Sequence, residues 1–95
     1  MARNERITLS KEQWTALSAA DVESITFQNI GRQPIYIAVT AGPAPSDKKA
    51  TLVYEPGQGE RNVALNELAP GVENPVRVYA FAPYLGHNEV FVSHA

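Results

Sequence analysis

Apolar and polar residues alternate along most of this chain, and the alternation restricts the folds that it can adopt. In the segment 23–29, Ile25 and Phe27 alternate with polar residues. A β-strand turns successive side chains to opposite faces, so this pattern predicts a strand with one buried and one solvated face. The same period of two recurs at 34–40, 76–82 and 89–94. The chain is therefore predicted to be all-β.

Proline and glycine separate the alternating segments, most clearly at 41–50, 55–60 and 83–88. Strand-like segments recur about every 8–12 residues, a spacing typical of sandwiches. We therefore expect seven or eight short strands in a single antiparallel β-sandwich or jelly-roll-like domain over residues 1–95. The segments 23–29 and 34–40 are predicted to pair as a hairpin across a turn at Gly31.

The first twenty residues allow two interpretations. Ser10 followed by Gln13 matches a capping box, which would start a helix over 10–20. The β character of the rest of the chain favours strands at ERITL and WTALS instead. Residues 1–6 are polar and are predicted to form an arm that is flexible or ordered on a partner. The start lacks the apolar stretch of a signal peptide, so we expect synthesis in a cytoplasm.

The composition disfavours most reaction chemistry. The chain has no cysteine, which excludes disulfides, cysteine zinc sites and a thiol nucleophile. A formal net charge of −2 is not the basic footprint of a nucleic-acid-binding protein. Two histidines, His87 and His94, are too few to form a metal site by themselves. We therefore expect no catalytic residue, no metal, no cofactor, and no nucleic-acid or membrane partner.

Several aromatic residues occupy strand positions that should face outward. Arg77, Tyr79 and Phe81 share one face of 76–82, and residues of the same kind lie opposite the aliphatic faces of two other strands. Aromatic residues and arginine are enriched in the centres of protein interfaces. The candidates for a subunit interface are Tyr36, Arg77, Tyr79, Phe81 and Phe91. Two alternatives remain open: this face binds a ligand or nucleic acid, or the second sheet packs on it.

A second group of aromatic residues suggests carbohydrate binding. Trp14, Tyr54 and Tyr84 are candidates for stacking on sugar rings, and Tyr84 lies in the PYLG loop. This hypothesis makes the chain a carbohydrate- or surface-binding module. It is compatible with a structural role, since an attachment protein can do both.

Four segments of the chain together resemble a known protein family. The segment ITFQNIGRQPIYIAVT, followed by APSDKKATLVYEPGQGE, VRVYAFA and EVFVSHA, resembles small β-sandwich virion proteins of tailed phages and gene transfer agents. The family motif matches this chain at Ile25, Thr26, Phe27, Gln28, Asn29, Gly31, Pro34, Ile35, Tyr36 and Ile37. The loop 66–75 departs from the compact turn of that family.

The resemblance implies a non-enzymatic structural component of a virion, made in a bacterial cytoplasm. Proteins of this type decorate capsids or form head-fibre or spike-base parts, and a trimer is the oligomer that the resemblance favours. The implied partners are further copies of the chain and a major capsid or fibre protein. A chain of 95 residues buries only roughly 60–65% of its unfolded surface, so assembly would add to its burial.

Overall fold

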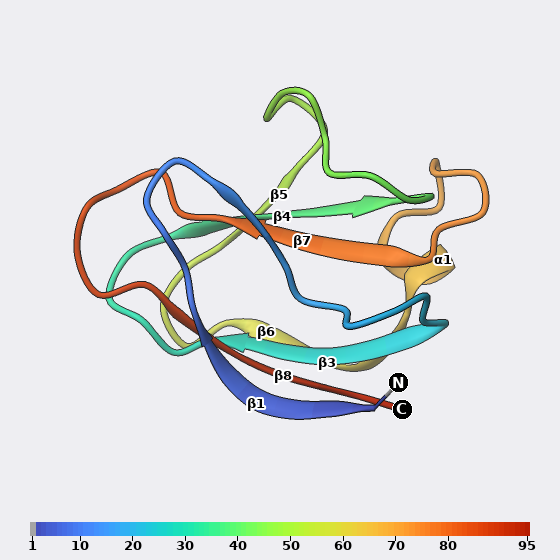
Figure 1. Cartoon of the computed structure of the whole chain (residues 1–95), viewed down its shortest axis with the longest axis horizontal. Coiled ribbons are helices and arrows are strands. Elements are labelled where there is room, and N and C mark those ends of the chain that lie inside the picture. Colours follow the sequence, from blue (N-terminus) through green and yellow to red (C-terminus); the bar gives the residue numbers. More distant parts are fainter. Residues whose placement is uncertain (1) are drawn as a thin grey trace.

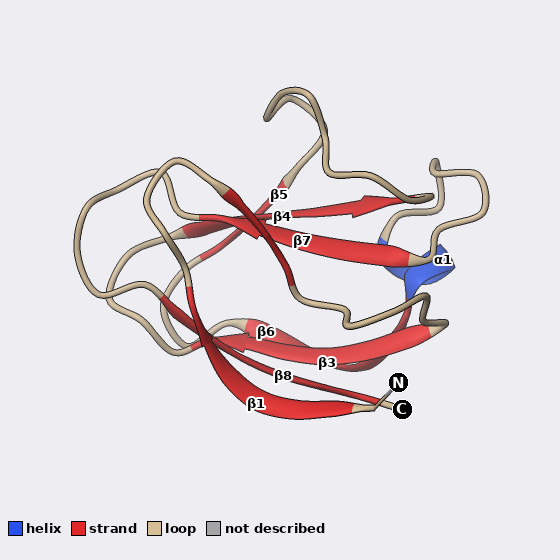
Figure 2. Cartoon of the chain, in the orientation of Figure 1, coloured by secondary structure: helices blue, strands red, loops and turns tan. Residues whose placement is uncertain are grey.

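The computed structural model describes residues 2–95 and contains eight strands and one short helix (Figures 1 and 2). The elements in chain order are β1 (Arg3–Thr8), β2 (Trp14–Ala16), β3 (Ser24–Asn29), β4 (Ile35–Thr40), β5 (Leu52–Tyr54), β6 (Gly59–Ala64), α1 (Leu65–Leu68), β7 (Arg77–Phe81) and β8 (Glu89–His94). The all-β prediction is confirmed.

The strands form two packed sheets of four, with the orders β1-β8-β3-β6 and β2-β7-β4-β5. The first strand pairs with the last, β2 with β7, β3 with β6 and β4 with β5, and every pair is antiparallel. The chain is thus arranged as one long hairpin rolled into two layers, which Figure 1 shows edge-on. This nested connectivity is that of a jelly roll and confirms the predicted sandwich.

The predicted hairpin between 23–29 and 34–40 is wrong, because β3 and β4 lie in different sheets. The connecting segment pairs instead with the start of β8 and the loop before it: the Ile30 amide donates to the Glu89 carbonyl and the Arg32 amide to the His87 carbonyl. Gly31 packs so closely on this loop that a Cβ would meet the His87 carbonyl oxygen. Its small size, rather than a tight turn, explains the glycine.

The core lies between the sheets and is formed by the faces that the alternation predicted. Phe27 of β3 is 1% exposed, and its ring meets that of Tyr54 of β5 edge to face at a centroid distance of 5.0 Å. The other large side chains that are fully buried are Leu17, Ile25, Asn29, Ile35, Ile37, Leu65, Val78, Val90 and Val92. Burying aliphatic side chains from both sheets is the main stabilising contribution.

The N-terminal segment, for which the sequence allowed either a helix over 10–20 or strands, forms β-structure. Trp14–Ala16 pairs with β7, so the strand interpretation of this part of 10–20 is confirmed. The predicted arm at 1–6 is wrong for residues 3–6, which belong to β1 and pair with β8, while residue 1 lies outside the described residues. Backbone hydrogen bonds of a sheet do not depend on side-chain polarity, so the polar composition of residues 3–6 did not prevent them from forming a strand.

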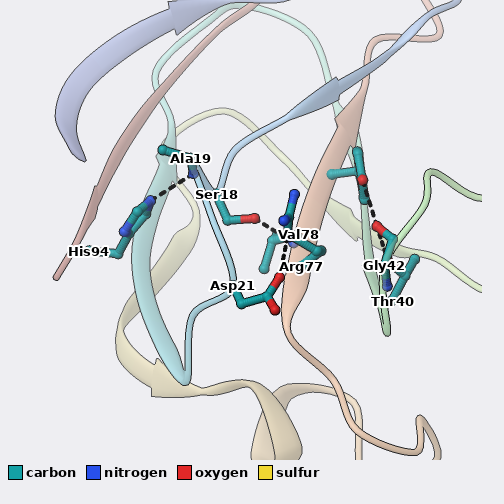
Figure 3. A network of polar contacts seen from close by, with 9 residues as sticks. Ser18, Ala19, Asp21, Thr40, Gly42, Arg77, Val78 and His94 are labelled. Carbon is teal, nitrogen blue, oxygen red and sulfur yellow. Dashed lines mark hydrogen bonds and ion pairs between the residues drawn. The ribbon is translucent and has the colours of Figure 1, made fainter. Parts of the chain in front are cut away.

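The segment 17–21 ties the two sheets together (Figure 3). On one side, the Val78 amide of β7 donates to the Ser18 hydroxyl at 3.2 Å, and Arg77 Nε donates to Asp21 at 2.6 Å. On the other, the Ala19 amide donates to His94 Nε2 of β8 at 3.0 Å. The segment therefore contacts β7 and β8, which lie in different layers.

The Gly59→Ala substitution tests the β3–β6 pairing. A Cβ at residue 59 would overlap the Phe27 carbonyl oxygen and approach Gln28 Cα to 2.6 Å, and both are backbone atoms of the neighbouring strand. We expect a loss of about 3 kcal/mol in the free energy of unfolding, measured by urea denaturation. In the control Gly71→Ala nothing lies within 4 Å of the new Cβ, so the two variants should differ clearly. Equal stabilities would contradict the pairing.

Because Tyr54 is buried, the free energy of unfolding should decrease at alkaline pH. Burial, together with the hydrogen bond that its hydroxyl donates to Glu60 at 3.1 Å, raises the pKa of Tyr54 above its ordinary value. The unfolded chain then loses this proton at about pH 10, before the folded chain does. The stabilisation is therefore complete below pH 10 and declines above it, by up to about 1.4 kcal/mol per pH unit.

The Tyr54→Phe variant isolates this effect, because it removes only the phenol hydroxyl of residue 54. We expect the difference in stability between wild type and Tyr54→Phe to be constant below about pH 9 and to shrink above about pH 10. Urea denaturation across that range measures it. Parallel profiles would show that Tyr54 keeps an ordinary pKa in the folded chain.

Candidate functional site

The outer face of the β2-β7-β4-β5 sheet carries a row of three aromatic rings. In the strand register Trp14 lies opposite Phe81, and Phe81 lies opposite Tyr36. The Trp14 and Phe81 rings are 5.1 Å apart and tilted by 56°, whereas the Tyr36 and Phe81 rings are nearly parallel at 6.1 Å. Directly opposite side chains share a face of the sheet, so these residues, called the aromatic row below, form one continuous surface.

The loop 41–50 rises above this face (the green segment in Figure 1). Residues of the loop and the aromatic row together line a groove. Lys48 Nζ lies 5.0 Å from the centre of the Phe81 ring, within cation–π range. The Tyr79 hydroxyl donates to the Gly42 carbonyl at 2.7 Å and anchors the start of the loop. The groove has a volume of about 410 Å³, and its remaining walls are Glu12, Pro45, Ser46, Asp47 and Pro83. Small-molecule sites fall in the same size range.

The structure brings together four of the five predicted interface residues. Tyr36, Arg77, Tyr79 and Phe81 all lie on the outer face of this sheet. Phe91 does not join them, because β8 belongs to the other sheet, where it pairs with Arg6 and Gln28. There it lines a second groove of about 330 Å³ beside β6.

These four residues differ in accessibility. Phe81 is only 6% exposed, because Trp14, Tyr36 and Lys48 surround its ring. Arg77 is paired with Asp21, and the Tyr79 hydroxyl holds the loop. Within the row itself, Trp14 and Tyr36 are partly exposed and are the aromatic side chains that another molecule could contact.

The three predicted glycan-contact residues are separated. Trp14 is part of the aromatic row. Tyr54 is buried against Phe27, so its ring cannot serve as a surface platform and this candidate is withdrawn. Tyr84 is 51% exposed in the loop between β7 and β8, next to Leu85 at 79%. Tyr54 faces inward because its register partner, Ile35, points into the core.

The two histidines have separate surroundings. His94 Nε2 accepts from the Ala19 amide, so the ring proton lies on Nδ1, which is 3.0 Å from the Ala95 carbonyl oxygen. His87 Nε2 lies 3.5 Å from Glu89 in the loop before β8. Within residues 2–95 no group of three or more potential metal-ligating side chains comes together.

Sequence reasoning missed two contributors to this site. Lys48 lies in a loop, and no local pattern predicts that it reaches a ring on β7. Val53 of β5 lies opposite Tyr36 and extends the aromatic row to the end of the sheet, where it is 54% exposed. The signal for Val53 was its place in the short strand predicted at 51–54, but its face depends on the strand register.

The fold and site define the chain as a jelly-roll β-sandwich with an aromatic groove on one outer face. Comparison of the chain with protein-family models, with curated proteins and with solved structures found no match. Among the described residues no helix has the length and apolar character needed to span a membrane.

Proposed function

We propose that this chain is a structural protein of a phage or phage-like particle, a capsid-decoration, head-fibre or spike-base subunit that assembles as a symmetric oligomer. The resemblance of residues 25–40 to such proteins motivates the proposal. The two-layered jelly roll supports it, since capsid proteins are among the proteins that use this architecture.

The observation that carries the proposal is the row formed by Trp14, Phe81, Tyr36 and Val53 across the whole width of one sheet. A solvated sheet face usually carries polar residues, so an aromatic stripe of this length favours coverage by protein. Interface centres are enriched in the same residue types. The resemblance implies a trimer, with a capsid or fibre protein as a second partner.

The test is to purify particles from the strain that encodes the chain and to identify their proteins by mass spectrometry. The proposal predicts the chain in a fixed copy number per particle, in gradient fractions that contain particles. A chain absent from particles but abundant in the cell extract would contradict it. Tyr36→Ser, against Leu85→Ser as an exposed apolar control, should lower the copy number without unfolding the domain.

A second candidate function is carbohydrate binding, and one observation favours it. The groove places the partly exposed Trp14 and Tyr36 beside the polar side chains of Glu12, Ser46 and Asp47. Aromatic rings with nearby hydrogen-bonding groups suit a sugar ring, which has apolar faces and hydroxyl edges. A glycan array screened with wild type and Trp14→Ala tests it, with Tyr84→Ala as the comparison. Binding lost in Trp14→Ala alone would place the sugar in the groove, and no binding at all would contradict this candidate.

A further inference from the structure

The two sheets have four edge strands, and three of them are guarded against pairing with another chain. β1 carries three charged residues, and β6 carries two together with a register irregularity opposite β3. The end of β2 is covered by Arg3, whose guanidinium donates to the carbonyls of Ala16 and Leu17 at 3.3 and 3.2 Å. Charges, bulges and covering groups are the usual means of preventing edge-to-edge association.

The fourth edge, β5, is short, with three residues, but among the described residues it carries no charge, bulge or covering group. Its sequence is Leu-Val-Tyr, and of the described strands it pairs only with β4. Leu52 and Val53 are 40% and 54% exposed, although both are large apolar side chains. They lie on opposite faces of the strand, because Leu52 pairs with the buried Ile37 and Val53 with Tyr36. An apolar edge strand with an unpaired side is a site for strand addition.

We infer that β5 pairs with β5 of a second copy of this chain, antiparallel and about a twofold axis at Val53. In this register Val53 lies opposite its own copy, and Leu52 lies opposite Tyr54. The two four-stranded sheets become one sheet of eight, and the row of Trp14, Phe81, Tyr36 and Val53 continues into the same row of the second copy. This inference rests on the self-assembly that the proposed function requires and names the contact.

The charges that flank β5 fit this arrangement. Lys49 precedes the strand and Glu55 follows it, and both side chains are exposed. Antiparallel pairing about Val53 brings Glu55, which follows β5, to the end of the other copy's β5 that Lys49 precedes. The twofold axis creates this opposite-charge pair twice. A parallel arrangement would place like charges together, which is unfavourable.

A twofold contact uses the same edge of both copies and, among the described strands, leaves no free apolar edge. The contact therefore stops at two copies. We expect the isolated chain to sediment at twice its mass of 10.4 kDa over a range of micromolar concentrations. This is a dimer rather than the trimer that the resemblance favours, and sedimentation equilibrium distinguishes the two.

Val53→Lys places two ammonium groups opposite each other and should raise the dimer dissociation constant at least about tenfold. Because Val53 is exposed in one copy, the thermal unfolding of the variant should stay close to that of the wild-type monomer. Leu85→Lys is the matched control, since Leu85 is also an exposed apolar residue but lies away from the edge. A wild type that remains monomeric, or a Val53→Lys dimer as tight as wild type, would overturn the inference.

Cysteine cross-linking tests the register without relying on a destabilising change. The chain has no cysteine of its own, so single substitutions give unambiguous products. Val53→Cys should form a disulfide dimer readily under mild oxidation, whereas Leu52→Cys should do so much more slowly, because its opposite residue is Tyr54. Equal rates for the two variants would overturn the twofold axis at Val53.

The outcome also separates this inference from the proposed function. A chain that is monomeric alone but present in particles contradicts the β5 contact and leaves the structural role in place. A chain that dimerises through β5 but is absent from particles does the reverse. If β5 pairs with a strand of another protein instead, the isolated chain should be monomeric but present in particles, and this result contradicts the β5 contact between copies.

Discussion

Phe27→Ala should lower the free energy of unfolding by about 3–5 kcal/mol, a large part of the roughly 5–15 kcal/mol that stabilises a small domain. Phe27 is 1% exposed at the centre of β3, and its ring packs edge to face on Tyr54 from the opposite sheet. Truncation removes this contact between layers and leaves a cavity that the rigid strands cannot close. Urea or thermal denaturation followed by circular dichroism measures the loss.

Two further variants serve as controls for Phe27→Ala. Leu85→Ala removes a side chain that is 79% exposed and should change stability by no more than about 0.5 kcal/mol. Phe27→Leu retains most of the apolar volume and should fall between the two. A loss below about 1 kcal/mol for Phe27→Ala would mean that the two sheets do not pack around this ring.

Asn29→Asp should lower the free energy of unfolding as much as Phe27→Ala does. The substitution only replaces a nitrogen by an oxygen and changes almost no volume. Asn29 is fully buried, and its Nδ2 donates to the carbonyls of Gln33 at 2.8 Å and Tyr54 at 3.0 Å, while its Oδ1 accepts from the Gly31 amide at 3.0 Å. An aspartate would turn a carboxylate oxygen toward two carbonyl oxygens. A buried charge without a partner costs about 3–5 kcal/mol.

The pH dependence of Asn29→Asp identifies the cause. Burial and the facing carbonyls would raise the pKa of the new carboxyl in the folded chain, so the variant should regain stability as the pH falls toward about 4, the value at which the unfolded chain binds the proton. Asn66→Asp, at an exposed position of α1, should show neither the loss nor the recovery. A deficit that stays constant with pH would contradict this account.

Asn29 also shows where reasoning from the sequence stopped. It appears in the resemblance only as part of a motif, and nothing in the residues around it indicates that its side chain ties β3 to the end of β5. The two segments are separated by the whole of β4 and the 41–50 loop. A hydrogen bond between distant segments leaves no local pattern to detect.

The candidate site also shows which features alternation could predict and which it could not. Alternation placed Arg77, Tyr79 and Phe81 on one face and Val78 and Ala80 on the other, and the structure confirms both faces. It could not show that Trp14, from the glycan candidates, and Tyr36, from the interface candidates, flank Phe81 in one row, since the three residues come from three strands. Nor could it show that Phe91 lies on the opposite outer face.

Alternation in the sequence was enough to predict that this chain forms short strands, where most of them lie, and which side of each is buried. Those properties depend on the two-residue period of a strand and on the cost of leaving apolar side chains in water, both of which act locally. The folded arrangement was needed to show which strands pair, that the 30–34 connection crosses between sheets, and which edge stays apolar and open. Strand pairing joins backbone groups that are alike in every residue, so its partners are selected by how the two layers pack and not by any single segment.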